Sequence, residues 1–149
     1  MDVYRISAVT LKIKDMRKSC NFYSKLPGFE LVYGGAASPF TTFEVGKGTK
    51  MYLNLELASD SKSTRINSAG THKEMKEVDF GRIIFHTTDV DALYRFMRND
   101  KGMSQTASFE VEPADAAWGE RFFHVRDPDD YQLSFAKPIS KEVKKYYCE

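Results

Sequence analysis

The sequence has very little of what marks a secreted or membrane-spanning protein. Only two of its 149 residues are cysteines, Cys20 and Cys148, and they form neither a CxxC pair nor a disulfide framework. No run of residues is long and apolar enough to span a bilayer. The first residues also lack the charged start and apolar run of a signal peptide. These absences predict a soluble, cytoplasmic protein with reduced thiols and no membrane partner.

An excess of one charge is missing as well. The chain has 22 Lys and Arg residues against 21 Asp and Glu, so its net charge of +1 gives no electrostatic footprint for nucleic acid. It also contains no phosphate-cradling glycine loop, no GxSxG and no HExxH. We therefore expect no nucleic-acid partner, and a function that none of these motifs describes.

An internal repeat is the main organisational signal. Residues 9–13 alternate between apolar and polar side chains, Asp15 follows as a candidate helix cap, and a helical pattern ends at Pro27-Gly28. The same order returns 74 residues later, with Asp89 as the cap and Gly102 as the expected helix end. Further strands are predicted at 29–33, 40–45 and 51–57, with Val45 corresponding to Val125 and 51–57 to 131–135. Each half is predicted to be β-α-β-β-β.

The stretch between the two halves differs in composition. Residues 58–79 are rich in Ser, Thr, Lys, Asn and Gly and have no apolar period, which is typical of a linker. We expect one α+β domain, 1–149, made of paired modules 1–57 and 80–138 with mixed sheets. A helix covers one face of each sheet, so the other faces are expected to form a groove.

A hairpin at 118–138 carries a family resemblance. Strands 122–126 and 131–136 flank a turn of Asp127, Pro128, Asp129 and Asp130, in which Asp130 is expected to tolerate the left-handed conformation. The aromatic-Gly pair, the alternating strand, Asp-Pro-Asp and the closing strand resemble the last hairpin of the vicinal oxygen chelate superfamily. This superfamily includes glyoxalases, extradiol dioxygenases, and bleomycin and fosfomycin resistance proteins. The resemblance implies the paired-module fold with its groove.

The resemblance also implies where a metal would bind. Catalytic members hold a divalent metal with one residue from the first strand and one from the last strand of each half. Those positions fall on Ala8, Arg82, Ser134 and either Glu56 or Asn54, of which Glu56 fits the apolar-Glu-Leu pattern better. Alanine has no donor atom, serine is a poor ligand and arginine repels a cation. We therefore expect no metal and no cofactor, unless His86, His124 and Glu56 form a rearranged site.

Side-chain alternation selects the candidate ligand-binding residues. Arg82 is expected to face the groove and to need an anion, supplied either by Glu56 as an internal ion pair or by a ligand carboxylate or phosphate. Trp118 and Phe122 either stack on a planar ligand or belong to the core. The predicted ligand-binding residues are Arg82, His124, Glu56, His86, Phe122, Trp118 and Ser134.

Three functions follow from these residues. The first is a small-molecule-binding protein with a degraded metal site, similar to the drug-sequestering branch of the superfamily, that takes a planar or anionic ligand. The alternative is a glyoxalase- or dioxygenase-type enzyme that uses a rearranged metal site or an acid/base pair of His124 and Glu56. The third is an interaction module with a vestigial groove. A homodimer is expected, either side by side or with exchanged modules.

Overall fold

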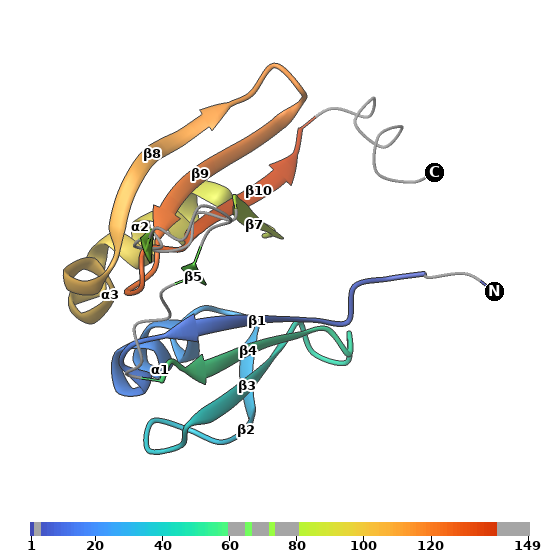
Figure 1. The fold of residues 1–149 in the computed structure, drawn as a ribbon. Coiled ribbons are helices and arrows are strands. Elements are labelled where there is room, and N and C mark those ends of the chain that lie inside the picture. Colours follow the sequence, from blue (N-terminus) through green and yellow to red (C-terminus); the bar gives the residue numbers. More distant parts are fainter. Residues whose placement is uncertain (2–3, 60–64, 67–71, 74–80, 140–149) are drawn as a thin grey trace. The chain divides into compact units, whose positions relative to one another are not determined.

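The computed structural model describes residues 1, 4–59, 65–66, 72–73 and 81–139. The chain divides into two compact units, Met1–Phe80 and Gly81–Glu149. Each unit has a four-stranded mixed sheet with one face against a helix, so the predicted α+β class and the repeated module are confirmed (Figure 1). The pairing of the two modules around a groove stays a prediction.

The first unit is built around a sheet with the strand order β1-β4-β3-β2. Strands β1 and β4 are parallel, and the other neighbours are antiparallel. Asp15 caps helix α1 as predicted, because its Oδ1 accepts a hydrogen bond from Lys18 N at 3.1 Å. The elements are β1 (Ala8–Ile13), α1 (Met16–Ser24), β2 (Phe29–Tyr33), β3 (Phe40–Val45) and β4 (Tyr52–Leu57).

Aromatic and aliphatic side chains fill the space between α1 and this sheet. Tyr23 of α1 is fully buried, with its ring 6.3 Å from that of Phe43 on β3. Cys20 is also buried, and burial raises the pKa of its thiol although a hydrogen bond with Thr41 opposes the shift. Cys148 lies outside the described residues.

The second unit repeats this topology, with the order β7-β10-β9-β8 and with β7 parallel to β10. Aromatic rings from three neighbouring strands pack on the side of the sheet that faces α2. Phe135 of the last strand stacks on Phe85 and Phe123, and Tyr94 of α2 contacts Phe123 edge-on. These rings form the core between α2 and the sheet. The elements are β7 (Arg82–His86), α2 (Val90–Asn99), α3 (Lys101–Thr106), β8 (Ser108–Asp115), β9 (Glu120–Arg126) and β10 (Gln132–Pro138).

The helical segment of the second unit ends differently from the prediction. Gly102 was expected to terminate the helix but lies within α3. Asp100 interrupts the segment instead, because its extended backbone ends α2 and its Oδ1 accepts from Met103 N at 2.9 Å to cap α3. A strong capping side chain therefore outweighs the helix-breaking tendency of the glycine two residues later.

The turn before the last strand differs in length between the units, and this corrects the predicted correspondence of residues. Val45 N donates to Met51 O at 2.9 Å, and Asp127 N donates to Tyr131 O at 3.0 Å, so Val45 corresponds to Asp127 and not to Val125. The intervening turns span 46–50 in the first unit and 128–130 in the second. The shift of 80 residues that relates Met51 to Tyr131 does not hold before the turn, because the first turn is two residues longer than the second.

The residue that closes each turn has a left-handed backbone. Asp130 has φ 72°, as expected for an aspartate in this place, and Lys50 has φ 55°. In the second unit Asp127 holds the turn, because its buried carboxylate accepts from the amides of Asp129 and Tyr131, both at 2.9 Å. The turn formers Asp127 and Asp130 thus fix the hairpin that the sequence predicted.

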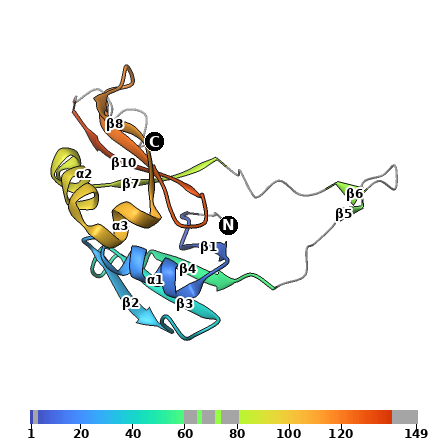
Figure 2. The ribbon, with the colours of Figure 1, turned by 90° about the vertical axis from the view of Figure 1, so that its left-hand side faces the viewer.

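The predicted linker contains a short sheet. Strands β5 (Arg65–Ile66) and β6 (His72–Lys73) pair antiparallel within the stretch 58–79, where composition predicted no regular structure (Figure 2). Most of the remaining linker lies outside the described residues. Among the helices that the structure describes, none has the length and apolar character needed to cross a bilayer.

Candidate functional site

The side chains that carry chemistry in the second unit share the sheet face opposite the aromatic core. Strand register pairs Arg82 with Gln132, and Gln132 with Arg126, so these three form one row across the face. The next rows contain Ile84, Ser134 and His124, and then His86, Ala136 and Phe122. We call this set, together with Glu120 on β9, the polar face of the second unit.

His124 and Arg82 form the central polar contact of this face. Arg82 Nη1 lies 3.1 Å from His124 Nε2. His124 is only 7% exposed, and its burial, followed by the charge of Arg82, lowers the pKa of the imidazole, although Glu110 opposes the shift. The ring is therefore neutral at pH 7, and Nε2 accepts because a guanidinium can only donate.

The other ring nitrogen of His124 follows from this assignment. With Nε2 as the acceptor, Nδ1 carries the proton of the neutral ring. Nδ1 is buried, and within the described part of the chain it has no hydrogen-bond partner. A buried donor without an acceptor costs free energy. An acceptor that reached Nδ1 would therefore gain a favourable hydrogen bond.

The two arginines in one row differ in how their charge is neutralised. Arg126 forms an ion pair through Nε with Glu110 Oε1 and donates from Nη1 to Asp130 O at 2.7 Å. Arg82 contacts the neutral His124 instead, and the described residues supply it with no carboxylate. Within the described part of the chain, Arg82 is therefore a cation of this face without a carboxylate partner.

A second polar cluster, which the sequence analysis missed, surrounds Glu120. This carboxylate is only 3% exposed, and its Oε2 accepts from Trp118 Nε1 at 3.2 Å. Its Oε1 lies 3.3 Å from His86 Nε2, yet it has no hydrogen bond within the described part of the chain. The strand was expected to begin at Phe122, whereas β9 begins at Glu120. Extending the alternation by two residues would have found this side chain.

Aromatic rings connect the two clusters. The ring of Phe122 lies 5.5 Å from that of Trp118 and 4.9 Å from the imidazole of His124. Trp118 is more than half exposed and Phe122 is partly exposed. The predicted residues Trp118, Phe122 and His124 thus form a continuous series of rings, with a polar group at each end.

The corresponding face of the first unit is a closed set of polar contacts. Thr42 Oγ1 donates to Asn54 Oδ1 at 2.8 Å, and Asn54 Nδ2 donates to Thr10 Oγ1 at 3.2 Å. Glu56 pairs with Lys12, whose Nζ lies 2.6 Å from Oε2. Sequence reasoning did not consider Lys12 as the partner of Glu56, although parallel pairing of the first and last strands places the two side by side.

Strand register decides which residue of the first unit corresponds to Ser134. Ala8 pairs with Tyr52 as Arg82 pairs with Gln132, so the residue two positions further along is Asn54 in one unit and Ser134 in the other. Asn54, and not Glu56, is therefore the counterpart of Ser134. The sequence analysis favoured Glu56 because of the apolar-Glu-Leu pattern, whereas strand register selects Asn54.

The residues at the implied metal positions do not suit a divalent cation. Ala8 supplies no donor, Arg82 is a cation, Ser134 is a weak ligand and Asn54 already bonds two threonines. The three residues of the alternative metal site contact other side chains. Glu56 pairs with Lys12, His86 lies near Glu120, and His124 contacts Arg82. Across the described ranges, no three side chains of His, Cys, Asp or Glu gather as metal ligands.

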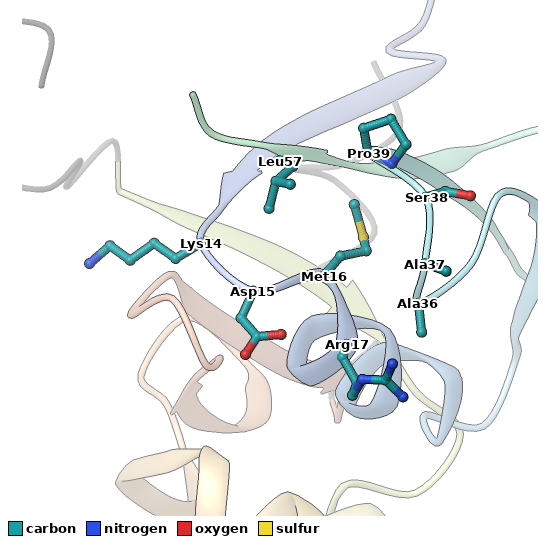
Figure 3. Close-up of a pocket in the computed structure, with 9 residues that line it drawn as sticks. All are labelled: Lys14, Asp15, Met16, Arg17, Ala36, Ala37, Ser38, Pro39 and Leu57. Atoms are coloured by element: carbon teal, nitrogen blue, oxygen red, sulfur yellow. The ribbon is translucent and has the colours of Figure 1, made fainter. Parts of the chain in front are cut away.

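A surface hollow of about 490 Å³ lies elsewhere, in the first unit. It is formed by the start of α1, the loop 36–39 and the end of β4, and the side chains of Met16 and Leu57 point toward one another in it (Figure 3). Its lining includes none of the predicted ligand-binding residues. The carboxylate of Asp15 already caps the helix start there, so the hollow offers no open anion site. We place the candidate site on the polar face of the second unit.

Comparisons with known proteins agree with this fold. Solved structures similar to the chain include a glyoxalase-related enzyme from Fulvimarina pelagi, which is 15% identical, with a TM-score of 0.62 over 90% of this chain and 88% of that one. A glyoxalase/bleomycin resistance protein/dioxygenase from Nocardioides is 18% identical, with a TM-score of 0.62 over 95% and 87%. A superfamily member from Sphaerobacter thermophilus is 23% identical, with a TM-score of 0.58 over 90% and 97%.

No curated protein matches the chain. The family model does, over residues 5–135, a range that begins before β1 and ends within β10. The chain therefore belongs to the glyoxalase/bleomycin resistance protein/dioxygenase superfamily.

Proposed function

We propose that this protein binds a planar anionic small molecule on the polar face of the second unit, without the divalent metal of catalytic superfamily members. The observation that carries the proposal is the contact between Arg82 and the neutral His124 at 3.1 Å. A guanidinium without a carboxylate favours an anion, and its planar fork can hold a carboxylate with two parallel hydrogen bonds.

The surroundings of Arg82 favour a ligand in which the anionic group is attached to a planar body. Ile84 lies beside it on β7, and the rings of Phe122 and Trp118 continue along the face from His124. Aromatic rings bind planar groups by stacking and also exclude water, which strengthens the charge-charge interaction. Ser134, buried beside His124 in the register, adds a hydroxyl to the same region.

Glu56 was the alternative source of an anion for Arg82. It has a cationic partner in its own unit, because Lys12 Nζ lies 2.6 Å from its carboxylate. Losing Arg82 would therefore not leave Glu56 without a counter-ion. This observation favours a ligand over Glu56 as the anion that Arg82 binds.

The test compares two arginine variants in one row of the sheet. The probe is biphenyl-4-carboxylate, titrated by calorimetry. We expect Arg82→Met to weaken binding at least tenfold, about 1.4 kcal/mol, because the cation that meets the carboxylate is lost. Arg126→Met is the matched control and should change the affinity less than about twofold, since Glu110 neutralises that cation. Equal effects of the two substitutions, or no binding by the wild-type protein, would refute the proposal.

The metal-free part of the proposal has a separate measurement. Protein purified without a histidine tag should contain well under one equivalent of Zn, Ni, Mn or Fe by elemental analysis, because Ala8, Arg82 and Ser134 provide a poor ligand set. One tightly held equivalent that is lost in a Glu56→Gln variant would instead support the glyoxalase- or dioxygenase-type enzyme. A homodimer remains part of the proposal, and sedimentation equilibrium over a wide concentration range measures it directly.

A further inference from the structure

Glu120 stands out among the side chains that the proposed function does not use. It is 3% exposed, and one of its carboxylate oxygens, Oε1, has no hydrogen bond within the described part of the chain. Burying a carboxylate is costly unless its oxygens meet donors. Trp118 Nε1, the hydrogen-bond donor that the described residues supply, reaches the other oxygen.

The side chains around Glu120 suit a positively charged group. His86 Nε2 lies 3.3 Å from Oε1, at the place where a donor would bind. His86 and Trp118 are both more than half exposed, so rotation of either side chain, which is fast for exposed residues, gives access to the carboxylate. The face of an indole ring also attracts a cation.

Glu120 lies at a fixed spacing from the proposed anion site. It precedes His124 by four residues on β9, a separation of about 13 Å along a strand. Phe122 lies between them on the same face, in ring contact with both Trp118 and His124. The face therefore presents a cation at one end, a carboxylate at the other and aromatic rings between them.

We infer that Glu120 is a second anchor of the same site, and that the ligand is an elongated aromatic zwitterion, with its acidic group at Arg82 and a protonated amine at Glu120. This inference rests on the proposed function, because it takes Arg82 as the anchor for the acid. The amine replaces His86 beside Oε1 and donates the hydrogen bond that this oxygen lacks. The aromatic body lies along Phe122.

Two probes with the same biphenyl-4-carboxylate body test the inference by calorimetry. The first is 4'-(aminomethyl)biphenyl-4-carboxylate, which carries both charges, and the second is biphenyl-4-carboxylate, which lacks the amine. The wild-type protein should bind the first probe at least tenfold more tightly. Glu120→Gln should remove that preference and leave the affinity for the second probe within about twofold. Arg82→Met should weaken both probes.

The outcomes separate the two proposals. If both probes bind the wild-type protein equally, or if the preference survives in Glu120→Gln, Glu120 is a structural residue and the inference is wrong while the anion site stands. If neither probe binds, the proposed function fails and the inference with it. The wild-type comparison decides the matter even if Glu120→Gln does not fold, and thermal unfolding of that variant shows whether it does.

Discussion

The two units have sheets of the same topology, but their polar faces differ in how fully the polar side chains are hydrogen-bonded. In the first unit, Thr10, Thr42 and Asn54 bond one another and Glu56 pairs with Lys12. In the second unit, Glu120 Oε1 and His124 Nδ1 are buried without hydrogen bonds in the described part of the chain, and both belong to β9. Native proteins satisfy nearly all such atoms, so the unsatisfied ones on β9 support our proposal that a ligand binds to the second unit.

Core truncation has the largest expected effect and shows whether the two units have equally well-packed cores. Phe43 and Phe123 are both fully buried, one in each unit. Phe43→Ala and Phe123→Ala should each lower the free energy of unfolding by about 3–5 kcal/mol, because each leaves a cavity. Chemical denaturation measures both. A cost below about 1 kcal/mol for one of them would show that its unit is loosely packed.

Equivalent polar positions provide the next test. Asn54 makes two side-chain hydrogen bonds, whereas its counterpart Ser134 makes none within the described residues. Asn54→Ala should cost about 1–3 kcal/mol, since the two threonine hydroxyls lose their shared partner. Ser134→Ala should stay within about 0.5 kcal/mol of the wild type. Similar costs at the two positions, measured by denaturation, would remove the contrast between the faces.

The smallest expected effect concerns pH. The pKa of His124 is lowered in the folded protein, so below the ordinary value of 6.5 the unfolded chain binds a proton that the folded ring takes up less readily. The free energy of unfolding should therefore fall as the pH drops from about 7 to about 5, and not change from this cause above pH 7. Thr42, the counterpart of His124, does not titrate.

The control for this pH effect is His124→Gln, followed by denaturation at several pH values. The variant should show a flatter dependence than the wild type in this range. The lowered pKa of Asp91, caused mainly by its hydrogen bond with Arg121, acts at more acidic pH and does not interfere. An unchanged slope in His124→Gln would contradict the assignment of a neutral, buried imidazole.

Much of the fold was predictable because its signals are local. Period-two alternation located the strands. Asp15 and Asp89 marked the helix starts, and each carboxylate accepts a hydrogen bond from the backbone amide three residues later. Gly102 misled because its helix-breaking tendency is weak compared with the cap that Asp100 provides. Composition gave no sign of the short pair β5 and β6 in the predicted linker.

The site was predictable only in part, since its chemistry depends on contacts between strands. Alternation placed Arg82 and His124 on one face, but it could not show that they bond each other or that Arg126 is neutralised by Glu110. These pairings follow from register, which depends on turn length and not on local pattern. The same limit left Glu56 and Asn54 as alternatives at one position, and it did not reveal that Lys12 is the neighbour of Glu56 across the parallel pair.

The unequal turns have a practical consequence for protein engineering. The turn 46–50 is exposed over most of its length, and lengthening a loop costs little free energy because closure entropy grows slowly with length. An inserted peptide tag or fluorophore site between Lys47 and Gly48 should be tolerated there. The matching turn at 128–130 is closed by the buried carboxylate of Asp127, so an insertion would break its hydrogen bonds. A reporter is therefore best grafted into the first unit, which leaves the second undisturbed for binding measurements.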